Sequence, residues 1–165
     1  MTIQIRPAIP DDAAQILRFI IELAVYEKAE EQVVTTLDSI GRSLFGAASP
    51  ARALMCEVDG AAAGFAVYFF SYSTWLGQPG LYLEDLYVSP RFRGSGAGKR
   101  LLQTLARIAV EHGCGRFEWS VLDWNAPAIR FYEGLGASAQ REWVRYRLAG
   151  DALRAVANDA PATAG

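Results

Sequence analysis

Histidine and cysteine are scarce in this sequence, with one histidine and two cysteines among 165 residues. Cys56 and Cys114 have neither the spacing of a metal-binding motif nor that of a redox pair. We therefore expect no bound metal and a cytoplasmic, reducing environment. His112 lies only two residues from Cys114, close to the end of an expected helix, so nothing indicates a cysteine nucleophile with a histidine base.

Two other features are missing, namely an excess of positive charge and a long hydrophobic segment. The formal net charge is −2, whereas nucleic-acid-binding domains usually carry a basic excess. The longest apolar run, Ala61 to Phe70, is far shorter than the roughly 20 residues that span a bilayer, and the first residues lack the apolar core of a secretion signal. We expect neither nucleic acid nor membrane as a partner, and a cationic small molecule fits better.

What the chain does contain is enough apolar sequence for a packed core. Hydrophobic residues make up 52% and charged residues 21%. A chain of this length can bury roughly 70% of its unfolded surface without disulfides or metals. We predict one domain over residues 1–150 and a frayed, alanine-rich tail over residues 151–165.

Periodicity and turn residues predict an α/β protein with a mixed sheet. Asp59-Gly60 is expected to form the turn of a hairpin, because both residues tolerate positive φ. Gly46 is expected to end a short helix in a left-handed conformation. The expected strands are 3–6, 54–58, 62–72, 81–88, 117–122 and 143–148, with one further strand possible at 137–140, and the expected helices are 12–27, 37–45, 98–112 and 126–135.

A glycine-rich loop, Arg93-Gly94-Ser95-Gly96-Ala97-Gly98, lies between an expected strand and an expected helix. Such a loop points backbone N–H groups at an anion and places the anion at the positive end of the helix. The spacing fits neither the dinucleotide fingerprint nor the loop of nucleoside triphosphatases. The sequence therefore predicts a phosphate-bearing ligand and disfavours nucleotide hydrolysis, although a glycine-rich turn can also simply begin a helix.

Two carboxylates, Glu84 and Asp85, interrupt the apolar strand 81–88. Adjacent strand residues point to opposite faces, so at most one of them is expected on a given face. One reading is that one of the two is solvated and the other caps or pairs locally. The other is that at least one meets a substrate cation, because a buried carboxylate is costly without a partner.

A third motif begins at Asn125, a plausible helix N-cap with Pro127 in the first turn. Tyr132 follows about two turns later on a similar side of the helix. On pattern alone, Phe131 and Tyr132 could equally be core aromatics.

Together these segments resemble the GCN5-related N-acetyltransferase (GNAT) superfamily, in particular its spermidine/spermine N-acetyltransferase-like branch. The similarity runs from about Ile5 to Leu148. It rests on Tyr82-Leu83-Glu84-Asp85, Arg93 to Lys99, Trp124 to Tyr132, Tyr26 to Val33, and Trp75-Leu76-Gly77. The resemblance implies an acyl-CoA N-acyltransferase fold, a single domain whose twisted mixed sheet is flanked by helices, with acetyl-coenzyme A as co-substrate and a homodimeric assembly.

The resemblance also implies roles for residues. It implies that the backbone of Leu86, Tyr87 and Val88 binds the pantetheine arm, and that Arg93, Gly94, Ser95, Gly96, Ala97, Gly98 and Lys99 form the pyrophosphate site. Asn125 would contact the cofactor arm and Tyr132 would lie by its sulfur. Glu84 would accept the amine proton, through water. Tyr26, Glu27, Trp75 and Asp85 would line the amine channel.

The predicted function is transfer of an acetyl group from acetyl-coenzyme A to a primary amine of a polyamine or diamine, without an acyl-enzyme. The alternatives are a lysine-like amino acid such as thialysine, a peptide amine, or a non-catalytic acyl-coenzyme A-binding module. Glu84 and Tyr132 together favour an enzyme, and no peptide groove is evident in the sequence.

Overall fold

The structure, a computed structural model, describes residues 1–159, and the chain forms two compact units, Met1–Leu122 and Asp123–Gly165. The strands of the first unit are β1 (Ile3–Pro7), β2 (Arg52–Val58), β3 (Ala61–Ser73), β4 (Gln78–Val88) and β5 (Arg116–Trp119). Its α-helices are α1 (Ala13–Tyr26), α2 (Leu37–Ser43) and α3 (Ala97–Glu111). The second unit contains α4 (Ala126–Gly134) and α5 (Gly150–Asp159).

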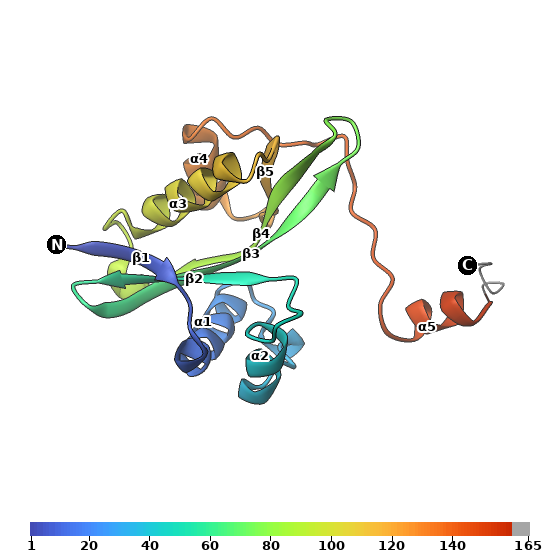
Figure 1. The fold of residues 1–165 in the computed structure, drawn as a ribbon, viewed down its shortest axis with the longest axis horizontal. Coiled ribbons are helices and arrows are strands. Elements are labelled where there is room, and N and C mark those ends of the chain that lie inside the picture. Colours follow the sequence, from blue (N-terminus) through green and yellow to red (C-terminus); the bar gives the residue numbers. More distant parts are fainter. Residues whose placement is uncertain (160–165) are drawn as a thin grey trace. The chain divides into compact units, whose positions relative to one another are not determined.

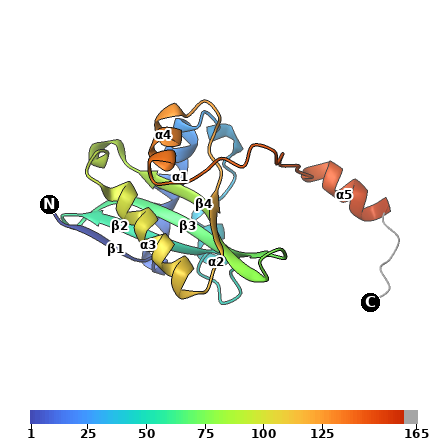
Figure 2. The same cartoon turned by 90° about the horizontal axis from the view of Figure 1, so that it is seen from above.

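The first unit is built on one five-stranded sheet in the order β1-β2-β3-β4-β5. Neighbouring strands are antiparallel from β1 to β4, and β5 is parallel to β4. Figures 1 and 2 show α3 over one face of this sheet and α1 with α2 over the other. The predicted fold class, a mixed sheet flanked by helices, is confirmed.

The β2–β3 hairpin turns at the expected pair of residues. Asp59 and Gly60 both have positive φ, 49° and 78°. Two successive residues in this region form the tight turn that matches the twist of antiparallel strands. The Thr2 backbone N–H donates to the Asp59 carboxylate at 2.8 Å and ties the start of the chain to this turn.

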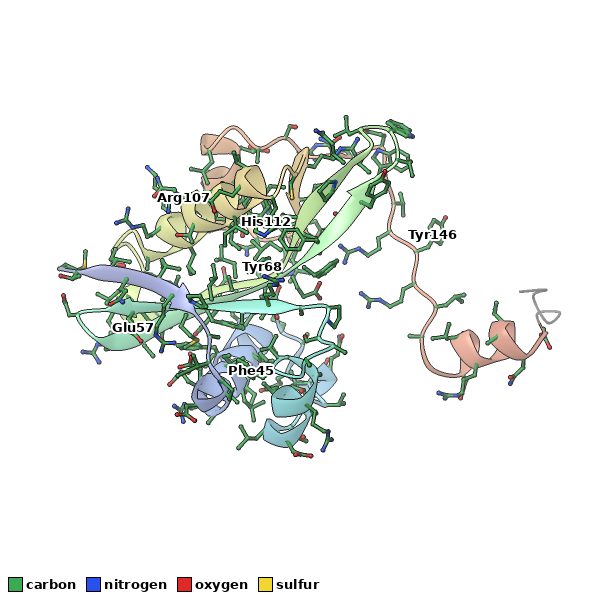
Figure 3. The ribbon with its side chains drawn as sticks, in the orientation of Figure 1. Phe45, Glu57, Tyr68, Arg107, His112 and Tyr146 are labelled. Atoms are coloured by element: carbon green, nitrogen blue, oxygen red, sulfur yellow. The ribbon has the colours of Figure 1, made fainter. Side chains whose placement is uncertain are left out.

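The core between the sheet and α1 is aromatic at its centre. The Phe19 ring of α1 lies 5.7 Å from the Phe65 ring of β3 and 5.7 Å from the Tyr87 ring of β4. Phe45, which follows α2, packs against the same cluster and is labelled on this side of the sheet in Figure 3. Burial of these rings fixes α1 against the part of β4 that carries the candidate site.

The opposite face packs against α3. Tyr68 of β3 lies on this face, and the His112 ring at the end of α3 lies 4.8 Å from the Phe70 ring (Figure 3). His112 also bonds through Nδ1 to the Ile108 carbonyl, 2.8 Å away. The only histidine of the sequence thus takes part in packing and hydrogen bonding at the end of α3.

Three expectations were wrong. Residues 137–140 and 143–148 form no strand, although their alternation is strand-like. Tyr146 of this extended segment, labelled in Figure 3, is 93% exposed. An alternating pattern of apolar and polar residues indicates which side chains would share one face of a strand, but it does not provide a neighbouring strand. A strand needs such a neighbour to satisfy its backbone hydrogen-bonding groups. The expected frayed tail instead contains α5, and residues 160–165 lie outside the described residues.

Gly46 follows α2 for a reason other than the expected one. Its φ is not positive, and its N–H donates to the Arg42 carbonyl at 3.1 Å. A Cβ at this position would lie 2.3 Å from the same oxygen. Close backbone approach, rather than left-handed geometry, therefore requires glycine here.

No helix within residues 1–159 has the length and apolar character needed to cross a bilayer.

Candidate active site

The glycine-rich loop connects β4 to α3 as predicted. Gly94 and Gly96 have φ of 78° and 92°, and Gly96 directly precedes the 15-residue α3. Gly96 has no side chain to cap the helix, and the N–H of Ala97, the first residue of α3, donates to Ser95 Oγ at 3.3 Å. The N–H groups of the first turn of a helix point out of its end. A Cβ on Gly94 would meet nothing within 4 Å, so the loop is open on that side. This geometry suits a diphosphate.

The end of β4 next to this loop lacks a neighbouring strand on one side. Within the described residues, β5 pairs only with Gly80 to Leu83. The remainder of β4, through Val88, has β3 alone beside it. The expected pantetheine-binding stretch, Leu86 to Val88, therefore lies where β4 has no neighbouring strand on one side, and the Val88 carbonyl accepts from Arg93 Nε at 3.1 Å. A linear amide-containing arm can pair with such an edge as a further strand does.

A β-bulge places Glu84 between the part of β4 that pairs with β5 and the part that pairs with β3 alone. Val67 of β3 pairs with Asp85, and the next residue, Tyr68, pairs with Leu83, so Glu84 is the extra residue. A bulge reverses the side on which the following residues lie. Leu83 accordingly shares the α3 face with Tyr68, whereas Asp85 shares the α1 face with Val67 and Tyr87. Simple alternation therefore breaks between Leu83 and Asp85, and the expectation that Glu84 and Asp85 point to opposite faces remains a prediction.

Asp85 is partly buried on the α1 face. Burial, together with the negative charges of Glu84 and Glu27, raises the pKa of Asp85 to about 6. Glu27 caps the end of α1, and burial raises its pKa as well. Burial and the charges of Glu84 and Glu27 disfavour the ionised form of Asp85, and a cation bound beside these carboxylates would offset that cost. Glu84 itself is exposed.

Aromatic and ionic contacts fix the end of α1 against β4. The Tyr87 hydroxyl donates to the Glu22 carboxylate at 2.7 Å. Tyr26, one helical turn beyond Glu22, lies under the guanidinium of Arg93, whose Cζ is 5.1 Å from its ring centre. The structure therefore brings together Tyr26, Glu27 and Asp85, three of the four residues expected to line the amine channel.

The fourth of these residues lies elsewhere. Trp75 is in the turn between β3 and β4 and is 80% exposed. Gln78, where β4 begins, and Asp85 are separated by about 23 Å of strand at about 3.3 Å per residue. Within one chain, Trp75 is not part of the acidic site.

Asn125 and Tyr132 belong to the second unit. Asn125 caps α4 as expected, because its side-chain oxygen accepts from the Ala128 N–H at 3.4 Å, and Pro127 lies in the first turn. The rings of Phe131 and Tyr132 are 5.7 Å apart, and Phe131 is exposed rather than buried in a core. The roles expected of Asn125 and Tyr132 toward the cofactor remain predictions.

Comparison with known proteins identifies the family. Residues 17–137 match the Acetyltransferase (GNAT) family. The chain belongs to this family. The match includes β4, the glycine-rich loop and α4, and so runs across the boundary between the two units. The chain is accordingly a GNAT N-acetyltransferase, and enzymes of this family use acetyl-coenzyme A.

Three relatives illustrate the similarity. The thialysine N-epsilon-acetyltransferase of Bos taurus is 37% identical over 94% of this chain and 97% of its own length. The spermidine/spermine N(1)-acetyltransferase-like protein 1 of Homo sapiens is 34% identical over 87% of this chain and 22% of its own. The solved structure of an integron cassette protein from the mobile metagenome of V. cholerae superposes with a TM-score of 0.81 at 28% identity, covering 96% of this chain and 99% of that one. The two named acetyltransferases are consistent with the predicted branch of the family.

Sequence reasoning missed two features of the site. The first is the bulge at Glu84. Leu83 and Tyr87 are spaced as if they shared one face of a regular strand, but in the structure both are buried and they face different helices. The second is the contact of Arg93 with Tyr26, which left no signal because the two residues are far apart in the sequence. Among the described residues, no group of three His, Cys, Asp or Glu side chains is arranged to hold a metal.

Proposed function

We propose that this protein transfers the acetyl group of acetyl-coenzyme A to a primary amine of a small cationic molecule. The observation that carries the proposal is the position of the acidic site. Asp85 directly precedes Leu86 to Val88, where β4 has an open edge, and the glycine-rich loop follows the same strand. An amine attracted by the carboxylates would thus lie beside a thioester whose arm follows that edge.

The acidic site addresses the main chemical difficulty, which is deprotonation. An aliphatic amine has a pKa near 10.4, so only about one molecule in a thousand is neutral at pH 7.4, which corresponds to about 4 kcal/mol. Asp85 and Glu27 attract the ammonium ion, while partial burial disfavours its charge. Glu84, exposed at the bulge, accepts the proton through water and returns it to solvent.

Acetyl transfer then forms one bond and breaks another. Coenzyme A supplies the activated acetyl group as a thioester. The neutral nitrogen attacks the acetyl carbon and forms the carbon–nitrogen bond, the carbon–sulfur bond breaks, and its electron pair leaves on sulfur. The attacking nitrogen loses a proton to water as the amide forms, and the thiolate takes up a proton from solvent. Tyr132 donates a hydrogen bond to that sulfur, where negative charge develops in the transition state. Full proton transfer from a phenol of pKa about 10 to a thiolate of pKa about 8.5 would be uphill by roughly 2 kcal/mol.

Two amine classes are candidates. Similarity along nearly the whole chain to a thialysine N-epsilon-acetyltransferase favours the side-chain amine of a lysine-like amino acid. Similarity to a spermidine/spermine acetyltransferase-like protein favours a polyamine or diamine. The three neighbouring carboxylates suit either cation.

A panel assay decides between them. Thiol release from acetyl-coenzyme A would be measured with thialysine, lysine, spermidine and putrescine. We expect kcat/KM for one class to exceed that for the other by at least tenfold. A protein that binds coenzyme A with no thiol release from any amine would be a binding module, and the proposal would be wrong.

Tyr132→Phe tests the role of that hydroxyl. We expect turnover to fall while the KM for acetyl-coenzyme A changes little, because the hydrogen bond strengthens only as the thiolate forms. A structural tyrosine would instead give normal turnover and a lower melting temperature.

We also propose that the protein is a cytoplasmic homodimer and binds neither nucleic acid nor membrane. Tyr72, Trp75 and Leu76 support self-association, because they expose apolar surface together at the tip of the β3–β4 hairpin. Light scattering during gel filtration would distinguish a dimer from a monomer.

A further inference from the structure

Arg93 opens the glycine-rich loop, but its side chain is directed back toward β4. Its Nε donates to the Val88 carbonyl at 3.1 Å. Its Cζ lies 5.1 Å from the Tyr26 ring centre and 5.9 Å from that of Tyr87. Both distances are within the range of a cation–π interaction. One guanidinium therefore joins the loop, the end of β4 and the end of α1.

The two aromatic rings differ in how firmly they are held. Tyr87 is buried in the core beside Phe19, and its hydroxyl bonds to Glu22. Tyr26 is 40% exposed in the last turn of α1. Arg93 thus contacts both the buried Tyr87 ring and the more exposed Tyr26 ring. A change in Arg93 can therefore move Tyr26 more easily than Tyr87.

Tyr26 directly precedes Glu27, the carboxylate of α1 that acts electrostatically on Asp85. Helix α1 ends at Tyr26, and Lys28 takes a left-handed φ of 59°, so the chain changes direction immediately after Glu27. Tyr26 and Glu27 are adjacent at this helix end, so a movement of Tyr26 away from β4 would also move Glu27 relative to Asp85.

We infer that Arg93 is a positioning residue that couples the cofactor loop to the amine-binding end of α1. A diphosphate that orders residues 94–98 also fixes Arg93, and Arg93 then holds Tyr26 and Glu27 against β4. This role rests on the proposed function. It predicts that coenzyme A and the amine strengthen each other's binding. Linkage makes that effect equal in both directions.

Three variants test this coupling. Arg93→Lys keeps a positive charge at the loop but loses the planar group that lies over two rings. Tyr26→Leu removes the other partner without changing the loop. Arg91→Lys is the matched control, because the Arg91 guanidinium lies over the ring of its sequence neighbour Phe92, with Cζ 5.1 Å from the ring centre.

The readouts are binding of coenzyme A by calorimetry, amide hydrogen exchange over residues 22–32, and the amine KM. In the wild type, coenzyme A should slow exchange at the end of α1. Arg93→Lys and Tyr26→Leu should each abolish that protection and raise the amine KM about two- to fivefold, and their double variant should be no worse than either. Arg91→Lys should retain both properties.

Two results would overturn the coupling. One is unchanged protection of residues 22–32 in Arg93→Lys and Tyr26→Leu. The other is an Arg93→Lys protein with weaker coenzyme A binding and an unaltered amine KM, which would make Arg93 a phosphate ligand only. A wild-type protein that binds no coenzyme A, or acetylates no amine, would instead defeat the proposed function.

Discussion

The two ends of β4 have different neighbours and different surfaces. From Gly80 to Leu83 the strand has a partner on each side, and the hairpin before it exposes Tyr72 and Trp75. Beyond the bulge at Glu84 it has β3 alone, and the surface becomes acidic. One strand thus provides a closed, apolar end and an open, charged end, with the bulge between them. The difference shows that a β-bulge of one residue can separate a fully paired part of a strand from a part whose edge is available for binding.

Glu84→Gln tests the open end most directly. We expect turnover to fall about 100-fold and its pH profile to shift upward, because general-base assistance is typically worth 10²-fold or more. The matched control is Glu118→Gln, an exposed carboxylate on β5 that pairs with the closed end of β4. An unaltered pH profile in Glu84→Gln would remove Glu84 from the path of the proton.

Two glycine substitutions compare backbone tolerance at the two ends. A Cβ on Gly64 would lie 2.3 Å from the Tyr87 carbonyl oxygen, whereas one on Gly80 would meet the rotatable Ser71 Oγ at 2.6 Å. Gly64→Ala should lower the free energy of unfolding by about 2 kcal/mol, within the range for overpacking, and Gly80→Ala by less. Urea denaturation measures both, and equal losses would contradict the comparison.

Asp85→Asn should raise the amine KM about tenfold at pH 7.5 through loss of one negative charge. In the wild type, the KM should rise as the pH falls through about 6, because Asp85 then binds a proton. Folding raises the pKa of Asp85 from its ordinary value of 3.8 to about 6, so stability is lost as the pH rises through this interval and the loss is complete above pH 6. Asp85→Asn should therefore increase the free energy of unfolding at pH 7.5, by on the order of 2 kcal/mol. A pH-dependent KM that persists in the variant would assign the titration to another group.

Trp75→Ala, at the closed end, should have the smallest effect on the cofactor site. We expect the dissociation constant for coenzyme A to change less than twofold, because Trp75 lies at the far end of β4. Self-association should weaken, since Trp75 contributes exposed apolar surface at the hairpin tip. Gel filtration with light scattering, alongside calorimetry, measures both. Impaired coenzyme A binding would show that the two ends are not independent.

Local sequence rules located most elements of the described chain. Asp59-Gly60 formed its hairpin, Gly94 and Gly96 took positive φ in the loop before α3, and Asn125 capped α4, because each outcome depends on residues adjacent in the chain. The rules failed for residues 143–148, where a strand depends on a partner that the segment's own sequence does not encode.

The sequence alone determined the chemistry available to the site: a glycine loop for phosphate, carboxylates for a cation, and tyrosines that can donate a hydrogen bond. Only the tertiary structure decided which of them act together. It separated Trp75 from Asp85, reversed the faces of β4 at Glu84, and brought Arg93 over Tyr26. The physical reason is that pKa shifts, ring contacts and strand edges depend on distances in space, which the packing of α1 and α3 on the sheet sets.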